Sequence, residues 1–200
     1  GAVTQLTNTP AYEGAPTWSP DGSFLAYEAY IDENLEIVVG PVEDPVANAV
    51  RLTSSPNTDH SPSWSPGGRQ IVFVSNGDII LADLDRTDDG RFQNLSGTTV
   101  ASESHPIWSP DGRRIAWASA SQTIAQSGIY VWDATRSIPA LWVGDGDYPA
   151  WNTLGDRILT TIATPNAAYI TSYSLDGEPL QPLTPFPGRL NGLVWANLIL

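Results

Sequence analysis

The chain has 200 residues, carries a formal net charge of −13 at pH 7 and contains no cysteine. The lack of cysteine excludes disulfide bonds and thiolate-bound metals. The negative charge argues against nucleic acids and anionic membrane surfaces as partners, because both recruit basic patches, and it favours basic partners, cations or simple solubility.

A tryptophan returns about every 44 residues, within a similar string of letters each time. The stretch "TWSPDG" at 17–22 returns as "SWSPGG" at 63–68 and "IWSPDG" at 107–112, and the weaker copies "AWNTLG" and "VWANLI" follow. A period of about 40–45 residues is typical of a four-stranded propeller blade, although helical repeats overlap this range. The five tryptophans are Trp18, Trp64, Trp108, Trp151 and Trp195.

Proline and glycine favour strands over helices in these repeats. In four copies a proline stands two residues before the tryptophan and a glycine stands four residues after it, a pattern that would break a helix. Because proline has no amide hydrogen to donate, its position predicts that the first strand of each repeat lies at a sheet edge. The glycines are Gly22, Gly68, Gly112 and Gly155.

The segments between the turns are short, alternating and rich in β-branched and aromatic residues, which predicts strands. After the strand that contains Trp18, the first repeat has "FLAYEAY" at 24–30, "LEIVVG" at 35–40 and "VRLT" at 50–53. The later repeats place strands at 70–76, 78–83 and 92–96, at 114–120 and 128–133, and at 157–163, 168–174 and 181–184. A four-stranded meander cannot bury both faces of its sheet alone, so we expect the sheets to stack radially.

The string Ser19–Gly22 predicts a type I turn that joins the first and second strands as a tight hairpin. In the second copy Gly67 replaces the aspartate, and the fourth copy keeps only Gly155, the residue required for a positive φ. The tryptophan before each turn is expected to pack between neighbouring blades, and stacking on a ligand is the alternative.

The copies "PTWSPDGSFLAY", "PSWSPGGRQIVF" and "PIWSPDGRRIAW", together with "IYVWD" at 129–133 and "LDGEPLQPLT" at 175–184, resemble the TolB-type (PD40, WD40-like) β-propeller repeat. The resemblance runs from Leu6 to Trp195. It implies an all-β fold, a β-propeller of four-stranded antiparallel blades. It implies little about function, because this repeat also occurs in peptidase-associated propellers and in surface proteins.

We predict a single propeller domain over residues 1–200, with blades at about 13–53, 59–96, 103–144 and 147–184. Residues 3–7 would pair with 191–200 as a split, partial fifth blade. Alternatively, the chain is a piece of a larger ring, or it self-associates, because an open ring would expose apolar faces and unpaired edges. No signal peptide or transmembrane span is visible, so we expect no direct membrane insertion of this segment.

Acidic residues and the only two histidines gather shortly before the tryptophans, where the loop from a fourth strand enters the next first strand. Such loops reach the mouth of a propeller channel, so we predict a ligand-binding site there. Clustered carboxylates suit a cation, a basic peptide end or a sugar, and otherwise they are loop residues that face water. No cofactor is expected, and calcium is the metal considered. The candidates are Glu13, Asp59, His60, Glu103, His105 and Asp147.

Motifs of common enzyme classes are absent from the sequence: it has no G-x-S-x-G elbow, P-loop, HExxH or Rossmann fingerprint. We therefore predict a non-catalytic recognition module outside the cytoplasm (periplasmic, secreted or at the cell surface) that binds a protein or peptide, or a small ligand, at the channel mouth. One alternative is the propeller part of a larger hydrolase or peptidase. Another is a glycosidase-like pocket that uses Glu13 with Glu103 or Asp59.

Overall fold

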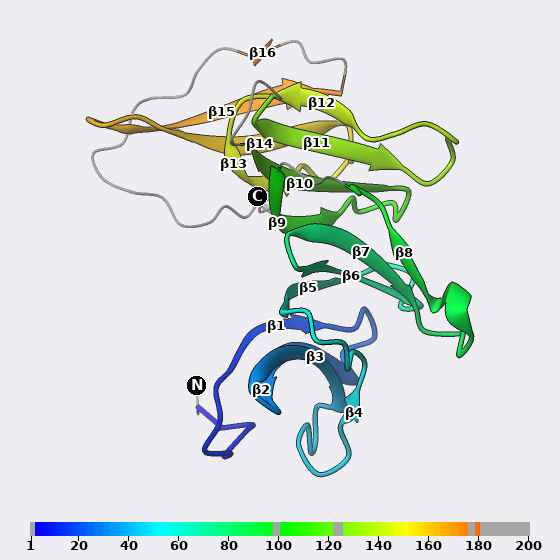
Figure 1. Ribbon diagram of the computed structural model, residues 1–200. Coiled ribbons are helices and arrows are strands. Elements are labelled where there is room, and N and C mark those ends of the chain that lie inside the picture. The colour runs from blue at the N-terminus through cyan, green and yellow to red at the C-terminus, as the bar shows by residue number, and fades with distance from the viewer. Residues whose placement is uncertain (1–2, 98–100, 122–125, 176–178, 181–200) are drawn as a thin grey trace. The chain divides into compact units, whose positions relative to one another are not determined.

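The computed structural model describes residues 3–97, 101–121, 126–175 and 179–180. In this part of the chain sixteen strands form four antiparallel sheets of four strands each, and the helical element is the 3-10 turn η1 (Asp89–Arg91) (Figure 1). The chain divides into two compact units, Gly1–Asn94 and Leu95–Leu200, each with two of the sheets, where one domain is predicted. The predicted all-β fold of four-stranded antiparallel sheets is confirmed.

Both sheets of the first unit are meanders, in which each strand pairs with its neighbour in the chain. The first sheet contains β1 (Glu13–Trp18), β2 (Phe24–Ile31), β3 (Asn34–Pro41) and β4 (Val50–Arg51). The second contains β5 (Asp59–Trp64), β6 (Gln70–Ser75), β7 (Asp78–Asp83) and β8 (Phe92–Asn94). The strands β1 and β5 lie at sheet edges, as Pro16 and Pro62 predict.

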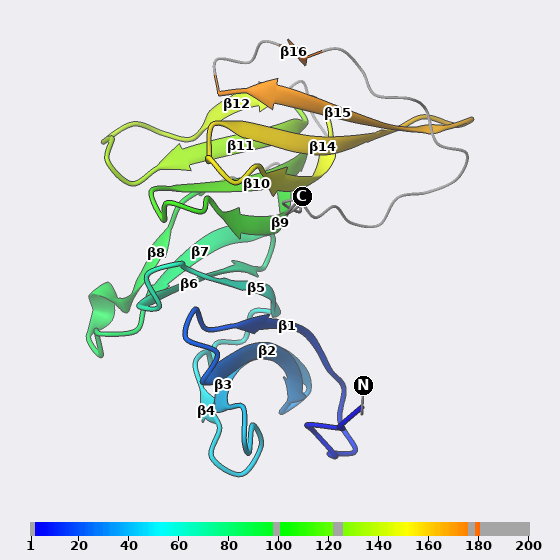
Figure 2. The same ribbon diagram turned by 180° about the vertical axis from the view of Figure 1, so that it is seen from behind.

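The second unit repeats this arrangement, with β9 and β13 at the sheet edges (Figure 2). Its first sheet contains β9 (Ala101–Trp108), β10 (Arg114–Ser121), β11 (Gly128–Asp133) and β12 (Leu141–Gly144). Its second sheet contains β13 (Asp147–Trp151), β14 (Arg157–Ala163), β15 (Ala168–Ser174) and β16 (Pro179–Leu180).

Of the two segments predicted to form a partial fifth blade, only the first lies within the described residues. Residues 3–7, for which a strand is predicted, form no strand here. Their predicted partner, residues 191–200 with Trp195, lies outside the described residues. A strand needs a neighbour to complete its hydrogen bonds, so the split blade and the number of blades stay predictions.

The predicted tight turn is present in all four sheets, each time with a hydrogen bond from the glycine amide to the carbonyl three residues earlier. In the first copy the amide of Gly22 donates to the carbonyl of Ser19 over 2.9 Å, and Gly22 has a φ of 73°. The Ser19 hydroxyl accepts the amide of Phe24, five residues further on, at 2.9 Å. The side chain that precedes the turn therefore closes the hairpin in addition to the backbone.

Asn152 takes over this role in the fourth copy, where the serine is missing. Its Oδ1 accepts the amide of Arg157, again five residues on, at 3.0 Å, and the amide of Asp156 at 3.1 Å. The sequence of this copy, "WNTLG", does not match the turn motif, yet the contacts of the turn are preserved.

We expect Asn152→Ala to lower the free energy of unfolding by about 1–2 kcal/mol, because two backbone amides at a buried turn lose their acceptor. Asn152→Ser should recover most of this loss, since serine accepts the same amide in the other three copies. Urea unfolding followed by circular dichroism measures both. Equal stability of the alanine and serine variants would contradict this account of the turn.

Apolar side chains fill the space between the two sheets of each unit. In the first unit Trp64 of the second sheet is 9% exposed and packs in one cluster with Ala26 and Ile37 of the first sheet. In the second unit Trp151 packs in the same way with Ile129 and Val143. The predicted packing of a tryptophan between neighbouring sheets is therefore present within both units.

Trp18 departs from this pattern, because it is 54% exposed. It pairs with Leu25 and shares the face of its sheet that points away from the second sheet of the unit. The inter-blade packing predicted for Trp18 is therefore not formed among the described residues. A tryptophan at this position needs a sheet on its own side, and the first unit provides a partner sheet only on the other side.

Candidate functional site

The predicted site residues lie in the first strand of each sheet and not in the preceding loops. Glu13 begins β1, Asp59 begins β5 and Asp147 begins β13, while Glu103 and His105 lie inside β9. The reason is that the pairing between the first and second strands continues N-terminal to the recurring tryptophan motif. Asp59 pairs with Ser75, and Glu103 pairs with Ser119.

A β-bulge interrupts the first strand of all four sheets at the same place, three residues before the tryptophan. The pairing register shifts there, and the residue that precedes the proline has a positive φ. A left-handed conformation is uncommon for residues other than glycine, and a following proline normally disfavours helical backbone. Bulges re-aim side chains next to functional sites. The four residues are Ala15 (44°), Ser61 (54°), His105 (53°) and Tyr148 (50°).

In the second unit the bulges of both sheets meet. The Nδ1 atom of His105 lies 3.2 Å from Oδ1 of Asp147, and the rings of His105 and Tyr148 have centroids 4.1 Å apart. The imidazole of His105, next to the carboxylate, lowers the pKa of Asp147 below its usual value. The side chains of His105 and Asp147 remain well exposed. We call His105, Asp147 and Tyr148 the bulge cluster.

The corresponding place in the first unit is built around Glu28, which sequence reasoning missed. Its carboxylate accepts the hydroxyl of Tyr12 at 2.8 Å and the backbone amide of Ser61, at the bulge of the neighbouring sheet, at 2.8 Å. The carboxylate also raises the pKa of Tyr12, because it accepts a hydrogen bond from the protonated hydroxyl and its charge opposes ionisation. The signal in the sequence is the single acid within the apolar strand "FLAYEAY". His60 lies beside this contact, with Nδ1 3.0 Å from the Ser61 hydroxyl.

The remaining predicted residues differ in their exposure. Glu13 is half-buried and accepts the hydroxyl of Thr9 at 2.7 Å. Asp59 and Glu103 are buried, with 1% and 3% of their surfaces exposed. Loss of hydration on burial raises the pKa of Asp59. These two carboxylates are therefore covered, where residues at an open channel mouth would face water.

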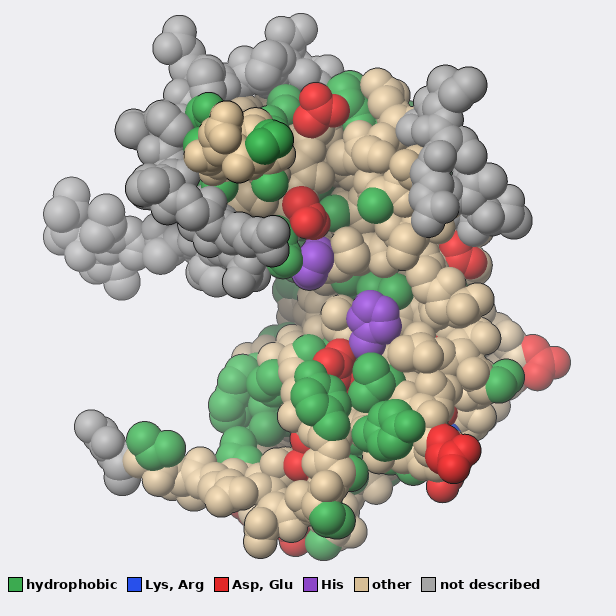
Figure 3. Space-filling model, turned by 60° about the vertical axis from the view of Figure 1, so that its left-hand side comes forward, with side chains coloured by type: hydrophobic (Ala, Val, Ile, Leu, Met, Phe, Trp, Pro, Cys, Tyr) green, Lys and Arg blue, Asp and Glu red, His purple; other side chains and the backbone are tan. Residues whose placement is uncertain are grey.

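Histidine side chains and acidic side chains reach the surface in Figure 3, and that face carries very little basic colour. Among the described residues, no group of three histidine or acidic side chains is placed to hold a metal ion. Calcium therefore stays a prediction without a ligand set. No helix in the described part of the chain has the length and apolarity to cross a membrane.

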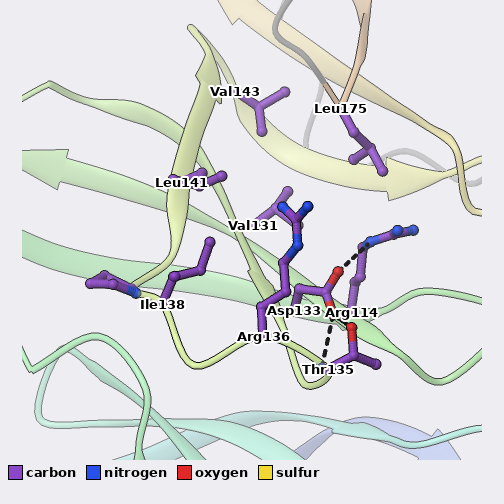
Figure 4. Close-up of a pocket in the computed structure, with 10 residues that line it drawn as sticks. Arg114, Val131, Asp133, Thr135, Arg136, Ile138, Leu141, Val143 and Leu175 are labelled. Atoms are coloured by element: carbon purple, nitrogen blue, oxygen red, sulfur yellow. Dashed lines mark hydrogen bonds and ion pairs between the residues drawn. The ribbon is translucent and has the colours of Figure 1, made fainter.

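A pocket of about 440 Å³ in the second unit has basic groups at its rim (Figure 4). Arg114 is held in place, because its Nε lies 3.2 Å from Oδ2 of Asp133 and its Nη1 donates to the Gly155 carbonyl at 3.3 Å. The Arg136 side chain extends along the pocket in Figure 4, beside an apolar floor that includes Val131 and Val143. Such a pocket suits a ligand with an anionic group attached to an apolar one. The predicted site did not include it.

Three comparisons with known proteins bear on the fold. Residues 36–132 match the family model of the dipeptidyl peptidase IV (DPP IV) N-terminal region. No curated protein matches the chain. Many solved structures do match it, at low sequence identity.

Two of the similar structures are TolB proteins. TolB from Acinetobacter baumannii has a TM-score of 0.65 and 21% identity, over 86% of this chain and 43% of that chain. A TolB candidate from Agrobacterium tumefaciens has a TM-score of 0.62 and 20% identity, over 95% of this chain and 88% of that chain. The chain thus spans less than half of the Acinetobacter protein.

The third structure is a puromycin-hydrolyzing peptidase from Mycobacterium tuberculosis, with a TM-score of 0.70 and 17% identity. The match covers 92% of this chain and 32% of the peptidase. Identities this low carry the fold and not the activity. The chain is therefore an all-β protein of four-stranded antiparallel sheets, similar in fold to the β-propellers of TolB and of a peptidase.

Proposed function

We propose that the chain is a non-catalytic recognition module that binds a basic segment of a protein or peptide partner at the bulge cluster. The observation that carries the proposal is the meeting of an imidazole, a carboxylate and a phenol from two neighbouring sheets at strained backbone positions. Strain of this kind persists where the surrounding structure holds it, and it is common at ligand-binding sites.

The geometry of the cluster supports binding of a cationic group. His105 and the amide of Tyr148 both contact Oδ1 of Asp147, which leaves Oδ2 available to accept hydrogen bonds from a partner. The rings of His105 and Tyr148 provide a flat apolar surface beside it. A net charge of −13 would steer basic segments toward the protein.

The proposal includes a location outside the cytoplasm. It also includes a propeller ring, which is closed in one of three ways: by a split blade of this chain, by further blades of a longer protein or by a second copy of the chain. The resemblance to TolB-type repeats supports the location. Light scattering distinguishes the closures, since a monomeric mass favours self-closure and a dimeric mass favours complementation.

The second candidate function is that of the propeller part of a larger peptidase. Both the match to the dipeptidyl peptidase IV N-terminal region and the fold of the puromycin-hydrolyzing peptidase support it. The sequence of the full-length gene tests it, because a hydrolase domain encoded beside this chain is required. The glycosidase alternative is tested by a panel of chromogenic glycosides, of which at least one must be cleaved.

We expect a fluorescent hexapeptide rich in arginine to bind the protein, and Asp147→Asn to weaken its binding by about tenfold, the loss typical of one charge-assisted contact. Tyr148→Ala should weaken it as well. The control Glu43→Gln removes the same charge at an exposed residue of the first unit, which is not part of the cluster. Fluorescence anisotropy measures the dissociation constants. If Asp147→Asn and Glu43→Gln have equal effects, binding depends on net charge alone and the site is wrong.

A further inference from the structure

A second pocket, of about 380 Å³, lies in the first unit between the segment that follows β4 and the strands β5 to β8. Its volume is within the range of small-molecule sites, about 300–1,000 Å³. Polar side chains line one side, and apolar and aromatic side chains line the other. The residues that matter here are Thr53, Asn57, Asp59, Ser75, Phe73 and Phe92.

Asp59 is the unusual member of this lining. It is almost completely buried, yet its Oδ1 atom has no hydrogen-bond partner among the residues that the structure describes. A buried carboxylate oxygen without a partner is costly, and in native proteins such a group calls for a ligand, an ion or a specific role. Because Asp59 also lines the pocket, a molecule bound there would lie next to this side chain.

The neighbouring acid Glu36 does not share this deficit. It is fully buried, but Oε1 accepts Nη2 of Arg51 and Oε2 accepts the hydroxyl of Thr53, both at 2.6 Å. Burial raises the pKa of Asp59, while hydrogen bonds from Ser75 and Thr53 to its carboxylate oppose this rise. Arg51 is already paired with Glu36 and Asp32.

The apolar side of the pocket is aromatic. The rings of Phe73 and Phe92 meet edge to face, with centroids 6.2 Å apart and an angle of 86° between their planes. Leu52 and Ile80 add aliphatic surface. Aromatic faces attract organic cations. They offer no replacement for the water molecules that a small metal ion holds tightly. The two sides together match a molecule with one positive charge and one apolar group.

We propose that this pocket binds a small organic ammonium ion, with its nitrogen at Oδ1 of Asp59 and its apolar group against Phe73 and Phe92. Asn57 lies in the same lining, where its Nδ2 donates to the Ser75 hydroxyl at 3.4 Å, and its Oδ1 can accept a hydrogen bond from the nitrogen. The site is separate from the bulge cluster, which belongs to the other unit. Ammonium binding at this pocket can therefore be tested separately from the proposed partner binding.

The experiment uses benzylammonium chloride as the probe and benzyl alcohol as its neutral counterpart. We expect isothermal titration calorimetry to detect benzylammonium binding in the millimolar range or tighter, and benzyl alcohol to bind at least about tenfold more weakly, because it lacks the charge. Asp59→Asn keeps the size of the side chain and should weaken benzylammonium binding by about tenfold or more. Phe92→Ala should weaken both ligands.

The control variant is Asp89→Asn, which removes one negative charge from an exposed turn of the same unit and should leave binding unchanged. Asp59→Asn removes a poorly solvated charge, so its unfolding midpoint should not fall, and circular dichroism checks this. Lack of benzylammonium binding at millimolar concentration would overturn the proposal. So would equal affinities for the two probes, or unchanged binding by Asp59→Asn.

Discussion

Trp64→Ala should lower the free energy of unfolding of the first unit by about 3–5 kcal/mol, the usual cost of replacing a buried tryptophan with alanine. The indole packs between the two sheets, against Ala26 and Ile37 on one side and Phe73 on the other. The substitution leaves a cavity that side chains anchored in two separate ladders cannot close by local relaxation. Urea unfolding followed by circular dichroism measures the loss.

Trp18→Ala is the matched control, since Trp18 has the same place in the repeat but is 54% exposed. Its removal should cost less than about 1.5 kcal/mol, because little of its surface leaves water on folding. The pair of variants thus separates packing between sheets from any general need for tryptophan at this position. Equal losses for Trp18→Ala and Trp64→Ala would show that another sheet covers Trp18 in solution.

Glu36→Ala should have the second large effect, a loss of about 3 kcal/mol, because breaking a buried ion pair leaves its partners without compensation. The guanidinium of Arg51 and the hydroxyl of Thr53 both lose an acceptor at 2.6 Å. Glu36 is fully buried, so water does not replace these contacts readily. The same unfolding measurement gives the size of the effect.

Asp32→Asn provides the comparison, because Asp32 is the other acid bound to Arg51 and its side chain is 78% exposed. Exposed pairs contribute about 0–1 kcal/mol, so the expected loss is below about 1 kcal/mol. Asparagine is chosen because Asp32 has a φ of 53°, a conformation that asparagine tolerates better than alanine. A loss as large as that of Glu36→Ala would mean that charge and not burial sets the stability of this pair.

The low identity of the similar structures limits what the fold explains about function. The same repeat architecture occurs in TolB and in a peptidase, so the sheets act as a scaffold and the chemistry depends on individual side chains. The side chains that we propose for this role come from the bulge cluster and from the pocket that Asp59 lines. Peptide binding at the bulge cluster and ammonium binding at Asp59 can therefore be tested by separate variants.

The sequence by itself determined the repeat, the order of the strands and the turns. These features depend on local chemistry: alternation of apolar residues sets a strand, and Ser19–Gly22 sets a turn with residues that are adjacent in the chain. The structure confirms them even in the fourth copy, where Asn152 supplies the acceptor that serine supplies elsewhere. At residues 3–7 the local pattern is not sufficient, because a strand also needs a partner, and the predicted partner lies outside the described residues.

The tertiary structure alone decided which of the candidate residues are buried and which meet. Asp59 and Glu103 are covered and His105 contacts Asp147, although all four precede a tryptophan in similar ways. Exposure and contact depend on the neighbouring sheet, whose residues are about 40 positions away in the chain. The hydrogen bond from the Ser61 amide to Glu28 joins two sheets, so the local sequence marks Glu28 as an unusual acid in its strand but does not identify its partner.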